Sequence, residues 1–202
     1  MSEFLTFMQL GFRHIVDIEA LDHILFLVAL AAIYRFRDVK SVLWVVTAFT
    51  VGHSVTLALS VTGLMVLPSA LVEFLIPVTI VATGIENLLV RDRSTGGRGH
   101  SWRPLFAGAF GLVHGAGFAN YLRAMFVDHI AVPLLGFNIG IEAGQLVVLL
   151  AIAFALALVD AALRLAREAR GADWQVHRLR VIGVSLVVVA VGSLWAIQRS
   201  PW

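Results

Sequence analysis

The stretch PLLGFNIGIEAGQLVVLLAIAFALALVD, residues 133–160, decides the fold class of this chain. Between its first residue and Val159 it holds a single ionisable side chain, Glu142, within a long series of apolar and small residues. A helix needs about 20 predominantly apolar residues to cross the hydrocarbon core of a bilayer. The stretch is therefore long enough to form a transmembrane helix.

Five further apolar segments occupy the rest of the chain, with Pro, Gly or charged residues between them: about 20–34, 42–63, 70–90, 104–126 and 180–198. The 202 residues are 59% hydrophobic and 14% charged, and the mean hydropathy is +0.90. Soluble domains carry roughly 25% charged residues. We therefore expect an all-α fold, a single membrane domain over residues 1–202 with about six transmembrane helices. Residues 1–19 form an N-terminal segment that we expect to lie at the membrane interface.

Basic residues alternate between the connections of these segments. They crowd the first, third and fifth connections and are almost absent from the second and fourth. Cytoplasmic connections of membrane proteins are enriched in Lys and Arg, so we expect both termini on the outer, periplasmic side of a bacterial inner membrane. The residues concerned are Arg35, Arg37, Lys40, Arg91, Arg93, Arg98, Arg103, Arg164, Arg167, Arg170, Arg178 and Arg180.

The composition also narrows the possible partners. The chain has no cysteine, which excludes disulfides and thiolate metal sites. Its positive charge is accounted for by the connections, so we expect the lipid bilayer and a metal ion as partners and no nucleic acid. A homo-oligomer is compatible with the glycine-rich helices.

Ionisable side chains at membrane depth are the candidates for a site, because each costs roughly 2.5–3.5 kcal/mol or more at the bilayer centre. His53 and His114 fall near the middle of the second and fourth segments, and Asp22 and His23 stand where the first segment begins. Helix bundles build metal sites from such side chains on facing helices. Imidazole and carboxylate suit divalent ions such as Ni²⁺, Co²⁺ or Zn²⁺.

A polar face on the fifth segment adds to this set. Asn138, Glu142 and Gln145 are spaced at i, i+4 and i+7, which is one face of a helix. The predicted metal ligands are His14, Asp17, Asp22, His23, His53, His114 and Glu142, and a secondary polar path comprises Ser54, Glu73, Glu86, Asn138 and Gln145.

Several blocks of the sequence stand in one order and together resemble the HupE/UreJ family of hydrogenase and urease accessory membrane proteins. The blocks are GFRHIVDIEALDHILFLVAL (11–30), TAFTVGHSVTLAL (47–59), VEFLIPVTIVATGIENL (72–88), FGLVHGAGFA (110–119) and FNIGIEAGQL (137–146). The resemblance implies a nickel or cobalt permease with a metal-binding His–Asp motif on the first helix. The matching residues are His14, Asp22 and His23 in that motif and His53, His114 and Glu142 within the membrane. One departure is the longer spacer after His14, so the sequence leaves its role as a ligand open.

Three hypotheses of function follow from these residues. The first is a transition-metal permease. The second is a zinc-dependent intramembrane hydrolase in which His23, His53 and His114 bind Zn²⁺ and Asp22 or Glu142 is the general base; the chain lacks the compact H-E-x-x-H signature of such enzymes. The third is a non-catalytic accessory protein whose buried polar groups only fix helix packing, so that the purified protein contains no stoichiometric metal.

Overall fold

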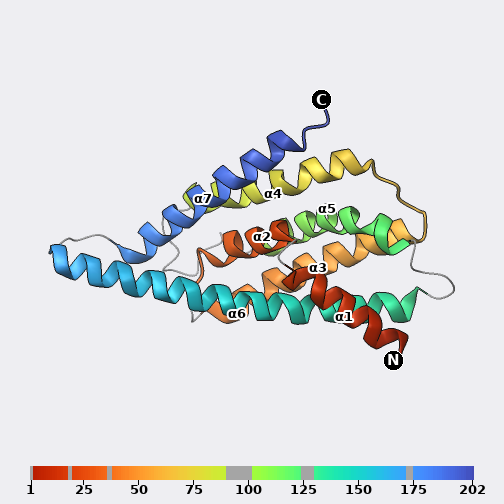
Figure 1. Ribbon diagram of the computed structural model, residues 1–202, viewed down its shortest axis with the longest axis horizontal. Coiled ribbons are helices and arrows are strands. Elements are labelled where there is room, and N and C mark those ends of the chain that lie inside the picture. The colour runs from red at the N-terminus through yellow and green to blue at the C-terminus, as the bar shows by residue number, and fades with distance from the viewer. Residues whose placement is uncertain (1, 18–19, 36–37, 90–101, 124–129, 172–174) are drawn as a thin grey trace.

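Every regular element in the described part of the chain is a helix. The computed structural model describes residues 2–17, 20–35, 38–89, 102–123, 130–171 and 175–202. The helices, shown in Figure 1, are α1 (Glu3–Val16), α2 (Leu21–Ala31), α3 (Val39–Val61), α4 (Ser69–Leu89), α5 (Arg103–Arg123), α6 (Ala131–Arg170) and α7 (Val176–Gln198). The all-α prediction is confirmed for these residues. The basic residues Arg37, Arg91, Arg93 and Arg98 lie outside them.

Four of these helices are long and apolar enough to cross a membrane, namely α3, α4, α6 and α7. Helix α2 is apolar but has 11 residues, a rise of about 16 Å, which is half of the hydrocarbon thickness. Helix α5 has 21 residues but is less apolar than these four. The chain is therefore a helical membrane protein. The count of six spans and the outer placement of both termini remain predictions.

Three closely packed helix pairs, α3–α5, α1–α6 and α4–α7, make up most of the bundle. Glycines permit the close approach. A Cβ atom on Gly140 of α6 would lie 2.0 Å from the carbonyl oxygen of Met8 in α1, and one on Gly52 of α3 would lie 2.0 Å from that of Gly108 in α5. Small residues let helix backbones approach closely in membranes. These pairs therefore hold their helices in fixed register.

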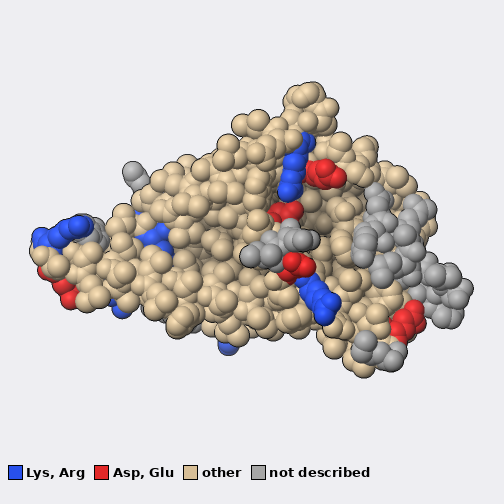
Figure 2. All heavy atoms as spheres, viewed as in Figure 1, with Lys and Arg blue, Asp and Glu red and all other residues tan. Residues whose placement is uncertain are grey.

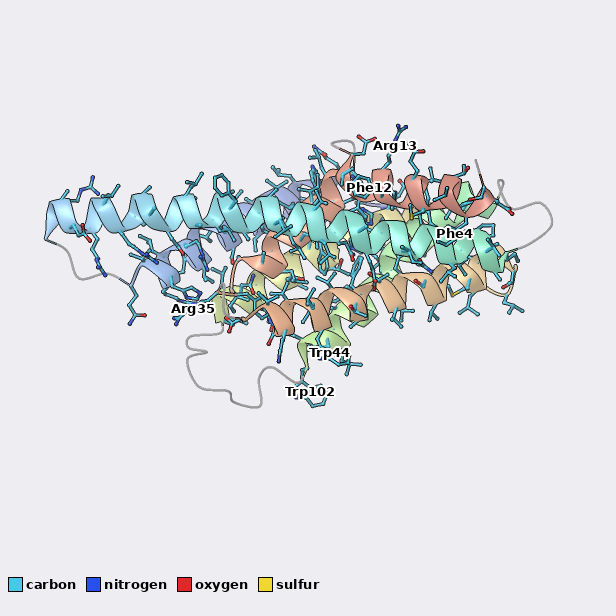
Figure 3. The ribbon with its side chains drawn as sticks, turned by 90° about the horizontal axis from the view of Figure 1, so that it is seen from below. Phe4, Phe12, Arg13, Arg35, Trp44 and Trp102 are labelled. Atoms are coloured by element: carbon cyan, nitrogen blue, oxygen red, sulfur yellow. The ribbon has the colours of Figure 1, made fainter. Side chains whose placement is uncertain are left out.

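Helices α1 and α2 follow one another along the bundle. In Figures 1 and 3, α1 runs from the N-terminus to the middle of the bundle, and α2 continues from there toward the end where α6 finishes. Helix α1 is amphipathic: Phe7, Gly11 and Ile15 are buried, whereas Gln9 and Arg13 are exposed. Figure 3 shows Arg13 pointing away from the bundle. The expected position of residues 1–19 at the membrane interface stays a prediction.

Helix α6 is longer than the sequence indicated. It has 40 residues and ends at Arg170 rather than near 160, and Gly171 closes it with a φ of 56°. Its last turns are rich in Ala, Leu and Arg, which are strong helix formers. Figure 2 shows Lys and Arg side chains gathered at this tip of the molecule. At this end of the bundle α2 and α6 finish and α7 begins. We call it the basic end.

The other predicted segments differ from the helices by a few residues. Helix α2 covers Leu21–Ala31 instead of 20–34, and α7 begins at Val176 instead of 180. The predicted 42–63 and 70–90 correspond to α3 and α4, and 104–126 corresponds to α5, whose last three predicted residues lie outside the described chain. Apolar side chains predict where a helix is buried, not where its backbone hydrogen bonds end, so such differences are expected.

Candidate metal centre

Two histidines flank the interruption between α1 and α2. His14 stands in the last turn of α1, and His23 in the first turn of α2 is 6% exposed. Their ring centroids are 4.7 Å apart. Interrupted helices at membrane depth occur where protein surrounds them or where they line a site. The break thus brings together two imidazoles that a continuous helix would separate by nine residues along its axis.

A third histidine, His53, comes from the middle of α3 and is fully buried. Its ring centroid is 6.2 Å from that of His14 and 6.3 Å from that of His23. Glycines of α5 fix its backbone, since a Cβ atom on Gly115 would lie 2.3 Å from the His53 carbonyl oxygen and one on Gly111 would lie 3.0 Å from its amide nitrogen. Close contact between α3 and α5 therefore sets the position of this imidazole.

One ring nitrogen from each of these three histidines lies within 4.8 Å of those of the other two. Nε2 of His14, Nε2 of His23 and both ring nitrogens of His53 are buried without a hydrogen-bond partner in the described part of the chain. A buried polar atom left unpaired costs about 1–3 kcal/mol. Together these nitrogens fit a metal ion, which accepts imidazole nitrogen and would satisfy several of them at once. We call His14, His23 and His53 the histidine cluster.

Asp22 positions one member of this cluster. Its Oδ1 lies 3.3 Å from Nδ1 of His23 and accepts a hydrogen bond from the backbone N–H of His23 at 3.0 Å. Its Oδ2 lies 3.5 Å from Nη1 of Arg199, at the end of α7. A carboxylate on one imidazole nitrogen fixes the tautomer and turns the other nitrogen toward a metal. Asp22 thus acts on the cluster through His23.

His114 lies beside the cluster rather than in it. It is 1% exposed, its ring centroid is 5.2 Å from that of His23, and its Nε2 lies 3.1 Å from the hydroxyl oxygen of Thr79. Among the described residues, the three histidines close enough to share a metal ion are His14, His23 and His53, without His114. Nδ1 of His114 is also buried without a hydrogen-bond partner among the described residues. The triad of His23, His53 and His114 predicted for a hydrolase stays a prediction.

Glu142 does not join the histidines. The polar face predicted on α6 is divided: Gln145 is buried and accepts a hydrogen bond from Thr50 at 2.9 Å, Asn138 is half-buried, and Glu142 is exposed. Residues three apart in a helix differ by about 60° around its axis, which is enough to place Gln145 against α3 and Glu142 on the outer surface. Glu142 is therefore outside the group of possible ligands, and its predicted role as a metal ligand stays a prediction.

The other predicted polar residues are scattered. Asp17 is exposed at the C-terminal end of α1, and Glu73 is exposed near the start of α4. Ser54 donates its hydroxyl to the carbonyl oxygen of Thr50 at 2.6 Å, which satisfies it within its own helix. The predicted polar path through these residues stays a prediction.

Glu86 has a structural partner at the basic end. Its carboxylate pairs with the guanidinium of Arg103 at 3.0 Å. Arg91 and Arg93, which are close to Glu86 in the sequence, lie outside the described residues. Glu86 therefore ties α4 to α5.

Aromatic rings and two polar partners were missed in the sequence. Phe118 has its ring centroid 4.0 Å from that of His14, and Phe49 lies 5.2 Å from His114. Both phenylalanines stand four residues from a histidine on their own helices, at the spacing of one helix face, so this spacing was a usable signal. The partners Thr79 and Arg199 carry no such signal, because their contacts join distant helices.

Comparison with known proteins identifies the family of the chain. A family model described as HupE / UreJ protein matches residues 1–199, which is essentially the whole chain. No curated protein and no solved structure gives a significant match. The matched region contains every residue of the histidine cluster together with Asp22 and Arg199. The chain belongs to the HupE/UreJ family.

Proposed function

We propose that the chain is a permease for a divalent transition-metal ion and that the histidine cluster binds the ion in transit. The observation that carries this proposal is the set of buried imidazole nitrogens on His14, His23 and His53 that have no hydrogen-bond partner among the described residues. Imidazole suits Ni²⁺, Co²⁺ and Zn²⁺. The family resemblance favours Ni²⁺ or Co²⁺, and the helices that can cross a membrane supply the scaffold for transport.

The spacing of the cluster suits an ion that is bound and released. Metal–imidazole bonds of about 2.0–2.1 Å put two ligand nitrogens of a tetrahedral site about 3.4 Å apart. The three nitrogens here lie within 4.8 Å of one another, so the rings close on the ion by rotation. Transport needs binding that is favourable enough for entry and weak enough for release. Three neutral ligands meet that requirement better than a closed, charged cage.

A compact set of three histidines is also the ligand set of some catalytic zinc sites, and this feature makes a hydrolase the second candidate. A hydrolase also needs a general base next to the metal-bound water. The two carboxylates proposed for that role are placed otherwise: Asp22 is engaged with His23 and Arg199, and Glu142 is exposed on α6. The geometry therefore favours the permease.

Metal binding tests the site. Purified protein in detergent is titrated with Ni²⁺ or Co²⁺ in a calorimeter, and His53→Ala is compared with His177→Ala. His177 lies at the basic end, where its Nε2 is 3.2 Å from the carbonyl oxygen of Ile33. We expect stoichiometric binding by the wild type and by the control, and affinity at least about 100-fold weaker in His53→Ala, because even the loss of a second-shell partner costs 10–100-fold.

Ion flux tests the transport. Proteoliposomes that contain a metal-sensitive dye should admit Ni²⁺ or Co²⁺ with the wild type, and His14→Ala, His23→Ala and His53→Ala should each abolish that flux. Stoichiometric metal without flux would overturn the permease in favour of a metalloenzyme. Absence of both binding and flux would leave a non-catalytic accessory protein.

A further inference from the structure

A second site lies at the basic end, away from the histidine cluster. A cavity of about 640 Å³ opens between α2, α3, α6 and α7, within the size range of small-molecule sites. Val42 of α3 and Leu149 and Leu156 of α6 contribute to an apolar wall. The charged residues of the lining are Arg35, which follows α2, Asp160 and Arg164 in the C-terminal half of α6, and Arg180 near the start of α7. The cavity is therefore apolar on one side and positively charged on the other.

Arg180 is built into this cavity with one donor unused. It is 6% exposed, it donates to Asp160 at 2.5 Å, and it donates to the carbonyl oxygens of Ala32 at 3.2 Å and Tyr34 at 3.0 Å. Its Nε has no hydrogen-bond partner in the described chain. A buried cationic N–H without an acceptor is costly. An acceptor oxygen from a bound molecule would satisfy it; Oδ1 of Asp160 is likewise buried without a partner in the described chain.

The charges around the cavity favour an anion. Arg35 and Arg164 line it and are exposed, and Figure 3 places Arg35 at the basic end of the bundle. Asp160 is the one acidic residue of the lining, and Arg180 already pairs with it. Three arginines against one carboxylate leave an excess of positive charge.

The apolar wall shows which anion fits. Leu43 and Leu150, which line the cavity, are 42% and 72% exposed, so the wall continues onto the outer surface of membrane-crossing helices. We propose that the cavity binds an anionic phospholipid, whose phosphate contacts Arg35, Arg164 and Arg180 while an acyl chain lies along α3 and α6. Basic pockets between transmembrane helices bind the headgroups of anionic lipids.

Thermal unfolding of delipidated protein in an uncharged detergent tests this site. We expect dioleoyl-phosphatidylglycerol to raise the unfolding midpoint at concentrations at least about tenfold below those of dioleoyl-phosphatidylcholine. Inorganic phosphate at the same concentrations should give no shift, since it lacks the acyl chain. An equal response to both lipids, or a full response to phosphate alone, would overturn the proposal.

Two pairs of variants locate the effect. In Arg35→Gln/Arg164→Gln the phosphatidylglycerol concentration for half of the shift should rise about 25-fold, because each of the two cations near an anionic headgroup contributes about fivefold. Arg170 is on α6, as Arg164 is, but lies outside the cavity lining. Arg170→Gln should therefore respond to phosphatidylglycerol as the wild type does. Ala153→Trp fills the cavity and should remove the lipid response, whereas Ala155→Trp, on an exposed position of α6, should keep it.

The outcome is independent of the metal site. The arginine variants should bind Ni²⁺ as the wild type does, so their loss of lipid response would not be confused with loss of the histidine cluster. Wild-type lipid response in the double arginine variant and in Ala153→Trp would contradict a lipid bound in this cavity.

Discussion

The molecule contains two sets of buried polar residues. They differ in how many of their polar atoms have a hydrogen-bond partner. At the basic end, Arg103 is 4% exposed; its guanidinium donates to Glu86 at 3.1 Å and also to Asn87. The amide of Asn87 donates in turn to the carbonyl oxygen of Ala29 at 2.6 Å. We call these residues the arginine network. It joins α5, α4 and α2 through direct contacts.

The histidine cluster is less completely satisfied. His14 is half-buried, His23 and His53 are buried, and the contact of His23 with Asp22 uses one ring nitrogen. Both ring nitrogens of His53 and one nitrogen each of His14 and His23 have no partner within the described residues. A satisfied buried network makes a fold rigid and specific, whereas an unsatisfied one lowers stability until something binds to it. The difference teaches that burial alone does not identify a functional site in a membrane bundle. Buried nitrogens without a hydrogen-bond partner are the feature that points to a site in this molecule.

The largest expected effect comes from breaking the arginine network. Arg103→Ala removes the guanidinium that pairs with Glu86 and donates to Asn87, and removal of one partner of a buried ion pair costs about 3–5 kcal/mol. We expect a loss of about 3 kcal/mol in the free energy of unfolding, at the lower end of that range, because Glu86 is 36% exposed. Denaturation in SDS micelles measures it. Affinity for Ni²⁺ should stay within about twofold of the wild type. A large loss of affinity without a loss of stability would mean that the two groups of residues are not separate in function.

The second effect concerns the residue that orients the cluster. Asp22→Asn removes the negative charge next to His23 but keeps the shape of the side chain. Second-shell changes of this kind cost 10–100-fold in metal affinity, or about 1.4–2.7 kcal/mol. Calorimetric titration with Ni²⁺ should show this loss.

Asp17→Asn is the matched control for that change. Asp17 is exposed and lies outside the group of possible ligands, so its variant should bind Ni²⁺ as the wild type does. If both variants lose affinity equally, then the loss of a negative charge in this region lowers affinity, and the contact of Asp22 with His23 has no specific effect.

The sequence predicted the fold well where the information is local. Apolar segments of sufficient length predicted α3, α4, α6 and α7, because lipid requires long apolar helices whose backbone groups are all paired within the helix. The break between α1 and α2 was less clear, since the charged residues 17–22 indicate polar surroundings but not that both flanking helices turn a histidine inward. His14 was left open as a ligand because its spacing from Asp22 and His23 is longer than in the family that the sequence resembles.

The site was predictable in its residue types more than in its grouping. His23 and His53 were recognised because ionisable side chains are rare at membrane depth. Glu142 satisfied the same criterion but is exposed. The position of a residue along an apolar segment predicts its depth in the membrane, but it does not predict which neighbouring helix the side chain contacts. The contact of Asp22 with Arg199 joins residues far apart in the chain, and no local pattern predicts it.

The smallest expected effect has the opposite sign to the first and distinguishes the two groups of residues most sharply. His53 is fully buried, and its ring centroid lies 6.2 Å from that of Phe49 and 6.4 Å from that of Phe137. His53→Leu keeps a side chain of similar volume and removes two unpaired nitrogens. In metal-free buffer we expect the free energy of unfolding to rise by about 1 kcal/mol.

Excess Ni²⁺ should reverse this order of stability. A ligand at 100 times its dissociation constant stabilises the folded state by about 2.7 kcal/mol, and only the wild type would gain that amount. Unfolding of both proteins, with chelator and with Ni²⁺, measures the reversal. If His53→Leu is instead less stable than the wild type in chelator, as Arg103→Ala is expected to be, then His53 already has a structural partner. The nitrogens of the cluster would then be part of the packing, and the contrast between the two groups of residues would no longer indicate a metal site.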